Sequence, residues 1–252
     1  MERLLANRLN WWLEFCGKLP NSQFDFRKQR SCIDNLTLLY GEIITSFQEN
    51  KTVSAAFLHV QSAYDTVLAD ILTEKVISLW VPPQTARFVY NLVSERQITC
   101  CFGDFEDVRL VNRGLPQECV CSPILYTIYV MELDRVCLNG CKIIQNADNV
   151  CLYSSTVGIN KGLNKLKKTL NNVVNVLDPL GLGLSAPKTQ LCVFSQNDQK
   201  LSEAAYINSR YTYKKRTLEI TIADTRVFFV FKVKFLGMIF CSNLDWTSHV
   251  MS

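Results

Sequence analysis

Histidine is scarce in this chain, and the cysteines lack the spacing that metal sites and disulfide frameworks need. Among 252 residues there are only two histidines, His59 and His249. The 11 cysteines are odd in number and include no CxxC pair. This composition gives no zinc motif and no framework of paired disulfides. We therefore expect reduced thiols, most of them buried.

Long apolar runs and a secretion signal are also missing. No stretch reaches the roughly 20 apolar residues of a membrane helix, and the N-terminus lacks the order of charged, apolar and small residues found in signal peptides. Charge is nearly balanced, with 27 basic and 23 acidic residues, which permits nucleic-acid binding without requiring it. We expect an intracellular protein, nuclear or cytoplasmic, without membrane contact.

Two helices are predicted in the first 50 residues. Apolar side chains recur at helical spacing from Leu5 to Cys16 and again from Leu36 to Phe47. Ser31 begins a Ser-x-x-Asp pattern, a variant of the capping box, before the second helix. The segment between them, QFDFRKQR at 23–30, is basic and aromatic. It suits contact with phosphates and bases, and a solvated loop is an equal alternative.

A central strand is predicted next, because residues 53–60, VSAAFLHV, form the nearly unbroken apolar run of a strand buried on both faces. It ends at a polar segment, 62–65. Later segments follow helical or alternating patterns. They are a helix at 68–79, a helix at 83–96, a hairpin at 98–111, a turn-rich loop at 113–121 and a helix from Ser122 to about Cys137.

The hairpin predicted at 141–153 is central to the functional interpretation. Two β-prone runs flank Asn146-Ala147-Asp148-Asn149, so Asp148 projects from a tight turn between strands. A carboxylate on such a rigid support suits a metal site. An ordinary polar turn is the alternative, because Asn and Asp favour turns for backbone reasons.

The last third of the chain contains one more amphipathic helix and several β-prone runs. In the helix, Lys161, Lys165 and Lys168 share a face, which indicates either a solvated surface or a nucleic-acid stripe. Residues 181–190 then turn the chain into a strand at 191–194. The remainder is mostly β-prone and has a basic patch at 214–216.

Eight short motifs occur in a fixed order along the chain. They are QFDFR at 23–27, SCIDNL at 31–36, FLHVQSAYD at 57–65, GLPQE at 114–118, SPILY at 122–126, ADN at 147–149, GLGLSAPKT at 181–189 and KFLG at 234–237. In this order and spacing they resemble the reverse transcriptase domain of non-LTR retrotransposons, most closely the insect Jockey and I-type elements. Nearly the whole chain is covered by the resemblance.

The resemblance implies an α+β fold, a polymerase palm with an antiparallel sheet and packed helices. It implies partial fingers at 1–50, a palm at 51–252 and no thumb. An RNA template, a DNA primer and a deoxynucleoside triphosphate are the implied partners, and Mg²⁺ is the implied cofactor. Protein partners are not indicated.

Asp148 is the one metal-ligating aspartate of the family that this chain keeps. The resemblance places two further aspartates where His59 and Asn149 stand. A neutral imidazole suits Zn²⁺ or Cu²⁺ better than Mg²⁺, and an amide oxygen carries no charge. We expect RNA-directed DNA polymerase activity to be lost or severely impaired. The alternatives are a non-catalytic nucleic-acid-binding protein that retains the cleft, and a decayed fragment without function.

The resemblance also implies roles for residues around this centre. Glu118, Asp25 and Asn146 depart from the family pattern, which has glycine at the first two positions and an aromatic at the third. Asp65 is expected to cap or brace the following helix. The implied roles are a metal-facing carbonyl for Val60, exclusion of a ribose 2′-hydroxyl for Tyr64, nucleotide contact for Gln117, protonation of pyrophosphate for Lys188, and template contact for Arg27 and Glu118.

Overall fold

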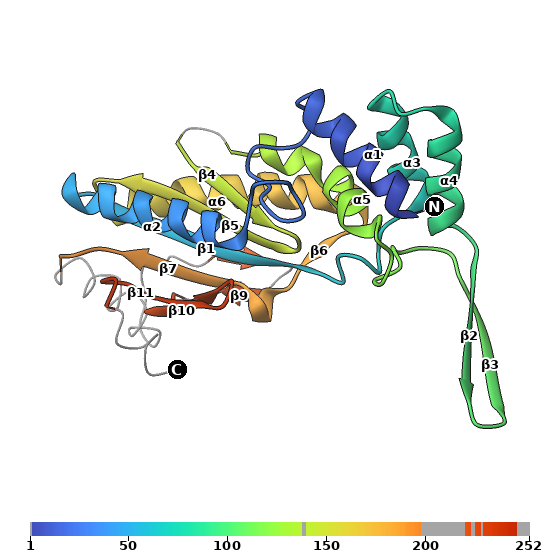
Figure 1. The fold of residues 1–252 in the computed structure, drawn as a ribbon. Coiled ribbons are helices and arrows are strands. Elements are labelled where there is room, and N and C mark those ends of the chain that lie inside the picture. The colour runs from blue at the N-terminus through green and yellow to red at the C-terminus, as the bar shows by residue number, and fades with distance from the viewer. Residues whose placement is uncertain (1, 138–139, 198–219, 223–224, 228, 246–252) are drawn as a thin grey trace. The chain divides into compact units, whose positions relative to one another are not determined.

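The computed structural model describes residues 2–137, 140–197, 220–222, 225–227 and 229–245 (Figure 1). Helices and antiparallel strands occur together, which confirms the α+β prediction. The chain forms two compact units, unit 1 (Met1–Asn21, Ser62–Leu133 and Val176–Gly183) and unit 2 (Ser22–Gln61, Asp134–Asn175 and Leu184–Ser252). This division does not coincide with residue 50, and the assignment of fingers and palm stays a prediction.

Unit 1 consists mainly of short helices and one hairpin. The antiparallel β2–β3 pair closes at Phe102 and Phe105 and extends away from α4 (Figure 1). The Tyr129 hydroxyl donates to the Leu180 carbonyl at 2.6 Å, which joins two segments of this unit. The elements in or reaching into unit 1 are α1 (Glu2–Phe15), α3 (Ala69–Ser78), α4 (Pro83–Val93), β2 (Arg96–Phe102), β3 (Phe105–Val111), α5 (Ser122–Tyr129) and the 3-10 turns η1 (Met131–Arg135) and η2 (Asp178–Leu180).

The helix predicted from Ser122 to about Cys137 is shorter than expected. It ends as α5 at Tyr129, and the separate turn η1 follows. The Lys75 ammonium donates to the Tyr129 carbonyl and to the Glu132 carboxylate, so a tertiary contact satisfies the end of the helix. Its N-cap is Cys121, and the Ser122 hydroxyl donates instead to the Pro116 carbonyl at 2.5 Å.

Unit 2 is built on a five-stranded sheet. The strand order is β4-β5-β1-β6, and β7 pairs with β1 beside β6. Pairs β4–β5, β1–β5 and β1–β7 are antiparallel. Its elements are α2 (Cys32–Gln48), β1 (Thr52–Gln61), β4 (Lys142–Asn146), β5 (Asn149–Thr156), α6 (Ile159–Leu177), β6 (Gly183–Leu184), η3 (Ala186–Lys188), β7 (Gln190–Phe194), β8 (Ile220–Ile222), β9 (Thr225–Val227), β10 (Lys232–Phe235) and β11 (Met238–Cys241).

Helix α2 and the β10–β11 hairpin cover one face of this sheet. The Phe57 and Phe235 rings lie 5.1 Å apart between centroids. The predicted capping box starts α2, because the Asp34 amide donates to the Ser31 hydroxyl at 3.3 Å and the Ser31 amide donates to the Asp34 carboxylate at 2.7 Å. The buried apolar core here comprises Leu39, Ile43, Phe47, Val53, Ala55, Phe57, Ile144, Cys151, Tyr153, Cys192, Phe194, Val233, Phe235 and Phe240.

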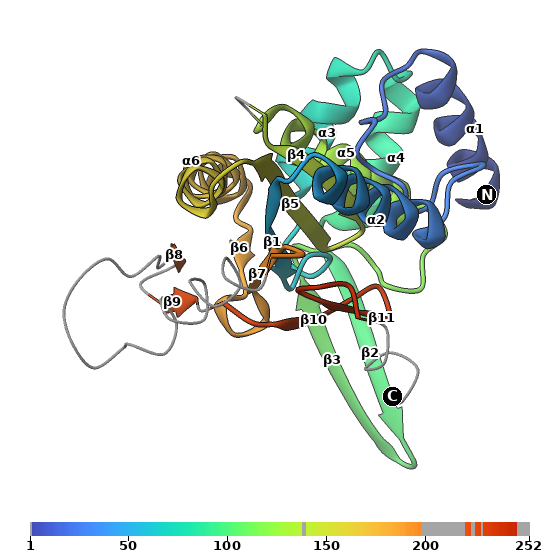
Figure 2. The same cartoon turned by 90° about the vertical axis from the view of Figure 1, so that its left-hand side faces the viewer.

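Helix α6 covers the opposite face of the sheet (Figure 2). A Cβ atom on Gly162 would lie 2.7 Å from the Ser54 hydroxyl and 2.9 Å from the Thr156 hydroxyl. Glycine therefore allows the helix to approach β1 and β5 closely. The apolar stripe that faces the sheet is buried, and it consists of Leu163, Leu166, Leu170 and Val173.

All 11 cysteines are free thiols, and several of them are buried. Burial raises the pKa of the Cys192 thiol to about 12, so this thiol stays protonated at neutral pH. No helix within the described residues is long and apolar enough to cross a membrane. The basic patch at 214–216 lies outside the described residues.

Candidate active site

His59 lies at the end of β1, on the face of the sheet that α2 covers. It continues the row of Ala55 and Phe57, and its register partner on β5 is Asn149. The β4–β5 turn is held beside this end, because the Val60 amide donates to the Asp148 carbonyl at 2.9 Å. The structure therefore brings the strand end and the hairpin tip together, as the resemblance implied.

The Asp148 carboxylate is occupied by neighbouring side chains. Its Oδ2 atom lies 3.3 Å from His59 Nδ1. Its Oδ1 atom accepts a hydrogen bond of 2.8 Å from Asn149 Nδ2. The Asn149 Oδ1 atom in turn lies 3.4 Å from His59 Nδ1. His59 and Asn149, at the positions where the resemblance implies aspartates, thus both contact the Asp148 carboxylate.

Lys188 completes the cluster from η3, the turn between β6 and β7. The Ser185 amide donates to the His59 carbonyl at 2.9 Å, which holds this turn against β1. The Lys188 Nζ atom lies 3.2 Å from His59 Nε2. Because an ammonium group can only donate, a hydrogen bond between these atoms would make Nε2 the acceptor and assign the imidazole hydrogen to Nδ1, which faces the oxygens of Asp148 and Asn149. We call His59, Asp148, Asn149 and Lys188 the Asp148 cluster.

A polar layer surrounds the cluster on the α2 side. The side-chain nitrogen Nδ2 of Asn146 donates to Asp25 Oδ2 at 3.4 Å. The side-chain oxygen Oδ1 of Asn146 accepts a hydrogen bond of 3.1 Å from Asn35 Nδ2. Burial, and secondarily the charge of Asp148, raise the pKa of Asp25. Sequence reasoning treated Asp25 only as a departure from a family glycine and did not place it here. Its position in a matched motif was the available signal.

The predicted nucleotide-binding residues Tyr64 and Gln117 lie in unit 1, at a joint between two loops. The Leu115 amide donates to the Tyr64 carbonyl at 2.7 Å, and Gln117 Nε2 donates to Asp65 Oδ1 at 3.3 Å. The Tyr64 ring stacks on Tyr126, with centroids 5.1 Å apart. The loop that carries Gln117 is therefore held by the segment that follows β1.

Two details of this joint differ from or refine the prediction. Asp65 was expected to cap or brace the following helix, but α3 has its N-cap at Leu68 without a side-chain cap, and Asp65 holds Gln117 instead. Gly114 adopts φ +86°, and a Cβ atom there would lie 2.7 Å from the Asp65 carbonyl oxygen. Only glycine fits this approach without strain. The predicted template contact Glu118 is exposed.

The remaining predicted residues, Arg27 and Val60, lie in unit 2. Arg27 is half-buried, and its guanidinium donates to the Gln23 carbonyl at 3.3 Å, which orders the loop before α2. The Val60 side chain is fully buried, and its amide holds the Asp148 turn. Their roles toward template and metal stay predictions.

The donor set of the Asp148 cluster does not fit the Mg²⁺ pair that the resemblance implies. Mg²⁺ requires hard oxygen ligands in near-octahedral geometry. The cluster offers one carboxylate, whose two oxygens are already bound, together with an imidazole, an amide and an ammonium group. Across the described ranges, no group of three or more His, Cys, Asp or Glu side chains could hold a metal ion.

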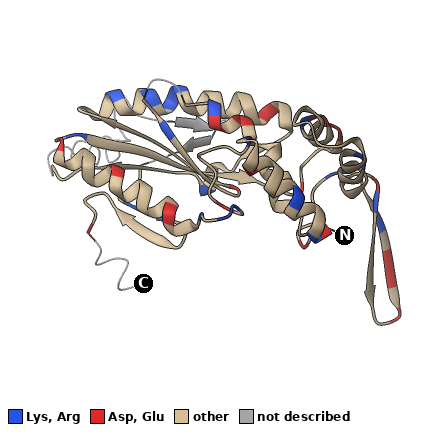
Figure 3. Cartoon of the chain, turned by 45° about the horizontal axis from the view of Figure 1, so that its top comes forward, with Lys and Arg blue, Asp and Glu red and all other residues tan. Residues whose placement is uncertain are grey.

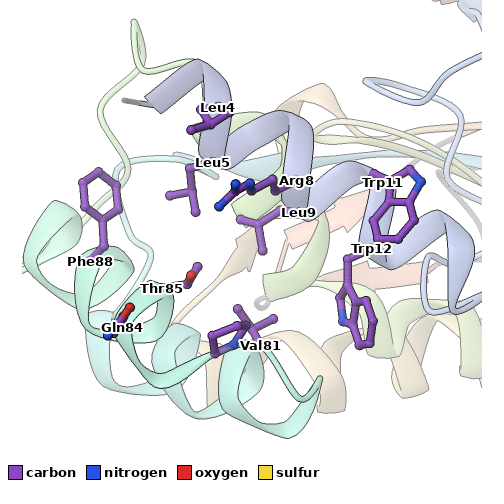
Figure 4. A pocket seen from close by; sticks show the side chains of 11 residues that line it. Leu4, Leu5, Arg8, Leu9, Trp11, Trp12, Val81, Gln84, Thr85 and Phe88 are labelled. Atoms are coloured by element: carbon purple, nitrogen blue, oxygen red, sulfur yellow. The ribbon is translucent and has the colours of Figure 1, made fainter.

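An apolar groove of about 800 Å³ lies in unit 1, between α1 and the start of α4 (Figure 4). The Trp11 ring stacks on Phe15 with centroids 5.2 Å apart, and both side chains are exposed. The lining contains no acidic group. It is formed by Leu4, Leu5, Arg8, Leu9, Trp11, Trp12, Val81, Pro82, Gln84, Thr85 and Phe88.

Comparison with known protein families supports the resemblance. The family model described as "Reverse transcriptase (RNA-dependent DNA polymerase)" matches residues 1–240. A probable RNA-directed DNA polymerase from transposon BS of Drosophila melanogaster is 31% identical over 132 residues, which are 52% of this chain and 15% of that protein. The RNA-directed DNA polymerase from mobile element jockey of the same species is 28% identical over 134 residues, 53% of this chain and 14% of that protein. The chain thus spans about one seventh of these relatives.

Solved telomerases share the fold. Telomerase from Candida tropicalis in complex with a TWJ fragment of telomeric RNA matches with a TM-score of 0.62 and 10% identity, over 96% of this chain and 36% of that chain. The apo telomerase of that species matches with a TM-score of 0.61 and 11% identity, over 97% of this chain and 40% of that chain. At this identity the likeness concerns the fold alone.

Proposed function

Because the chain belongs to the reverse transcriptase (RNA-dependent DNA polymerase) family, we propose that it is a reverse transcriptase domain of a non-LTR retrotransposon whose nucleotide transfer is lost or severely impaired. The observation that carries this proposal is the Asp148 cluster. Its single carboxylate is bound by His59 and Asn149, the two residues that replace the family's other ligands.

The physical reason is the missing negative charge. Polymerases of this kind use divalent metal ions to stabilise the attacking and leaving oxygens, which contributes several kcal/mol to catalysis. With one carboxylate in place of three, we propose that a single divalent ion binds weakly at Asp148 and that a pair does not bind. At about 1.4 kcal/mol for each tenfold change in rate, the loss reaches several orders of magnitude.

The position of Lys188 also supports an impaired nucleotide transfer, because it affects protonation of the leaving pyrophosphate. In the family this lysine is thought to protonate pyrophosphate. Here its ammonium group lies against His59 Nε2, so it would have to leave the imidazole before it could reach a phosphate. The imidazole therefore competes with the substrate for the proton donor as well as standing in place of a metal ligand.

We propose that the substrate-binding residues are better preserved than the catalytic ones. Tyr64 would exclude a ribose 2′-hydroxyl and Gln117 would contact a deoxynucleoside triphosphate, and both are held by unit 1 contacts. Arg27 would contact an RNA template paired with a DNA primer. Glu118 opposes this binding, because its carboxylate would lie beside phosphates.

The decisive experiment is primer extension on an RNA template, with Mg²⁺ and separately with Mn²⁺. Wild type is compared with Asp148→Asn and with the double revertant His59→Asp with Asn149→Asp. We expect wild type to incorporate no more than Asp148→Asn. Metal-dependent incorporation by wild type above that variant would overturn the proposal.

A direct metal titration decides the case in which none of the three proteins extends a primer. Mn²⁺ binding measured by electron paramagnetic resonance should be weak in wild type, absent in Asp148→Asn and tighter by at least about tenfold in the double revertant, which regains two carboxylates. Equal binding by all three proteins would show that these residues do not form a metal centre at all.

A further inference from the structure

We propose that the outer face of α6 binds the phosphodiester backbone of a nucleic acid strand, at a site separate from the Asp148 cluster. Residues 159–175 of this helix, within unit 2, contain four lysines and no acidic residue. Blue segments follow one another along the helix in Figure 3. We define the α6 groove as a depression of about 570 Å³ lined by Lys161, Asn164, Lys165, Lys168, Thr169, Asn171 and Asn172.

The groove contains only cationic and neutral polar side chains. Lys161, Lys165 and Lys168 are spaced by one helical turn each, so their charges repel one another, at a cost of about 0.2–0.5 kcal/mol per neighbouring pair. A helix face that only needs to be soluble usually mixes both signs of charge. None of the ion pairs found among the described residues includes a lysine of α6. An external polyanion would relieve this repulsion.

The walls of the groove are fixed by contacts within unit 2. The Asn172 amide donates to the Val136 carbonyl at 3.2 Å. A Cβ atom on Gly140 would lie 3.0 Å from the Lys165 Nζ atom, so this lysine lies against the backbone. The row from Lys161 to Lys168 is about 10 Å long by helical rise. One strand of a duplex has a phosphate for roughly every 3.4 Å of helix axis, so a row that runs along this axis spans about three phosphates.

The α6 groove is independent of the Asp148 cluster, because the two lie on opposite faces of the sheet. Helix α6 approaches Ser54, whereas His59 continues the row of Phe57 on the α2 face. Binding at α6 would therefore persist in a chain without catalytic activity. It would hold a strand by its backbone, without reading its bases.

Fluorescence anisotropy tests this proposal with a 20-nucleotide RNA, a DNA of the same sequence and an RNA duplex, between 50 and 300 mM salt. The groove variant is Lys161→Gln with Lys165→Gln and Lys168→Gln. The control is Lys18→Gln with Lys51→Gln and Lys167→Gln, which lowers net charge equally and includes an α6 lysine outside the groove. Comparing the RNA and DNA probes identifies which strand is preferred.

We expect the groove variant to bind RNA at least about tenfold more weakly than wild type. The dependence of log K on log salt should also become shallower by about two, because each lost phosphate contact reduces the magnitude of this slope by about 0.7–0.9. The control should stay within about threefold of wild type. Asp148→Asn should bind normally, and replacing the three lysines by arginine should preserve binding. Melting curves confirm that each variant is folded.

Three outcomes would overturn the proposal. Wild type could fail to bind RNA and DNA alike. The groove and control variants could lose equal affinity, which would make the effect one of net charge alone. Vesicles containing anionic lipid could bind wild type more tightly than RNA with the same dependence on the three lysines, which would assign the groove to a membrane surface.

Discussion

The Nε2 atom of His59 lies 3.2 Å from the ammonium nitrogen of Lys188, while its Nδ1 atom faces Asp148. The imidazole thus lies between the ammonium group of Lys188 and the carboxylate of Asp148. The charges of this centre are satisfied inside the protein. Binding a divalent ion would therefore stabilise this cluster less than it would stabilise a cluster of unpaired carboxylates.

The first prediction concerns the tautomer of His59. Nitrogen NMR at pH 8 should show hydrogen on Nδ1 and a bare Nε2, because the ammonium group of Lys188 can only donate. The His59→Gln variant assigns the signal. In Lys188→Met the constraint on Nε2 is removed, so the Nδ1–H fraction should fall. A protonated Nε2 in wild type at this pH would contradict the network.

The second prediction concerns the stability of the double revertant His59→Asp with Asn149→Asp. Three neighbouring carboxylates repel one another without metal, so this variant should melt lower than wild type by about 2–4 °C for each kcal/mol of repulsion. Millimolar Mg²⁺ should restore its melting temperature and leave that of wild type unchanged. A folded revertant that ignores Mg²⁺ would show that these side chains do not converge.

The third prediction concerns the pH dependence caused by Asp25. Its pKa is raised above the ordinary 3.8, mainly by burial, so the folded protein holds this proton more tightly than the unfolded chain. The stability that protonated Asp25 contributes is then lost as pH rises from 3.8 through the pKa of Asp25 in the folded protein. Asp25→Asn should melt higher than wild type at pH 7, with the difference shrinking toward pH 4. Asp104→Asn, at an exposed turn, should show neither effect.

The fourth prediction compares two helical glycines. Gly162→Ala should lower the free energy of unfolding by about 1–3 kcal/mol, because its Cβ would lie 2.7 Å from the Ser54 hydroxyl. Gly41→Ala, in α2, meets no atom within 4 Å, so it should raise stability by about 0.5–1 kcal/mol. Urea denaturation measures both. A stabilising Gly162→Ala would mean that α6 does not approach β1 so closely.

The sequence alone determined the family and most of the helices and strands. The apolar run at 53–60 predicted a buried strand, the two β-prone runs on either side of Asp148 predicted a hairpin, and Ser31 with Asp34 marked the start of α2. These features depend on residues close together in the chain. Local periodicity and capping chemistry are therefore enough to place them.

Only the tertiary structure decided how the site is connected. The registers of β1 with β5 and β7 place Asn149 opposite His59 and fold Lys188 back onto the same imidazole, across 90 and 129 residues of sequence. The end of α5 is likewise set by Lys75, and the environment of Asp25 by Asn146. Such contacts depend on which strands pair and how helices pack. The groups that meet are distant in the chain, so the sequence around one group does not predict its partner.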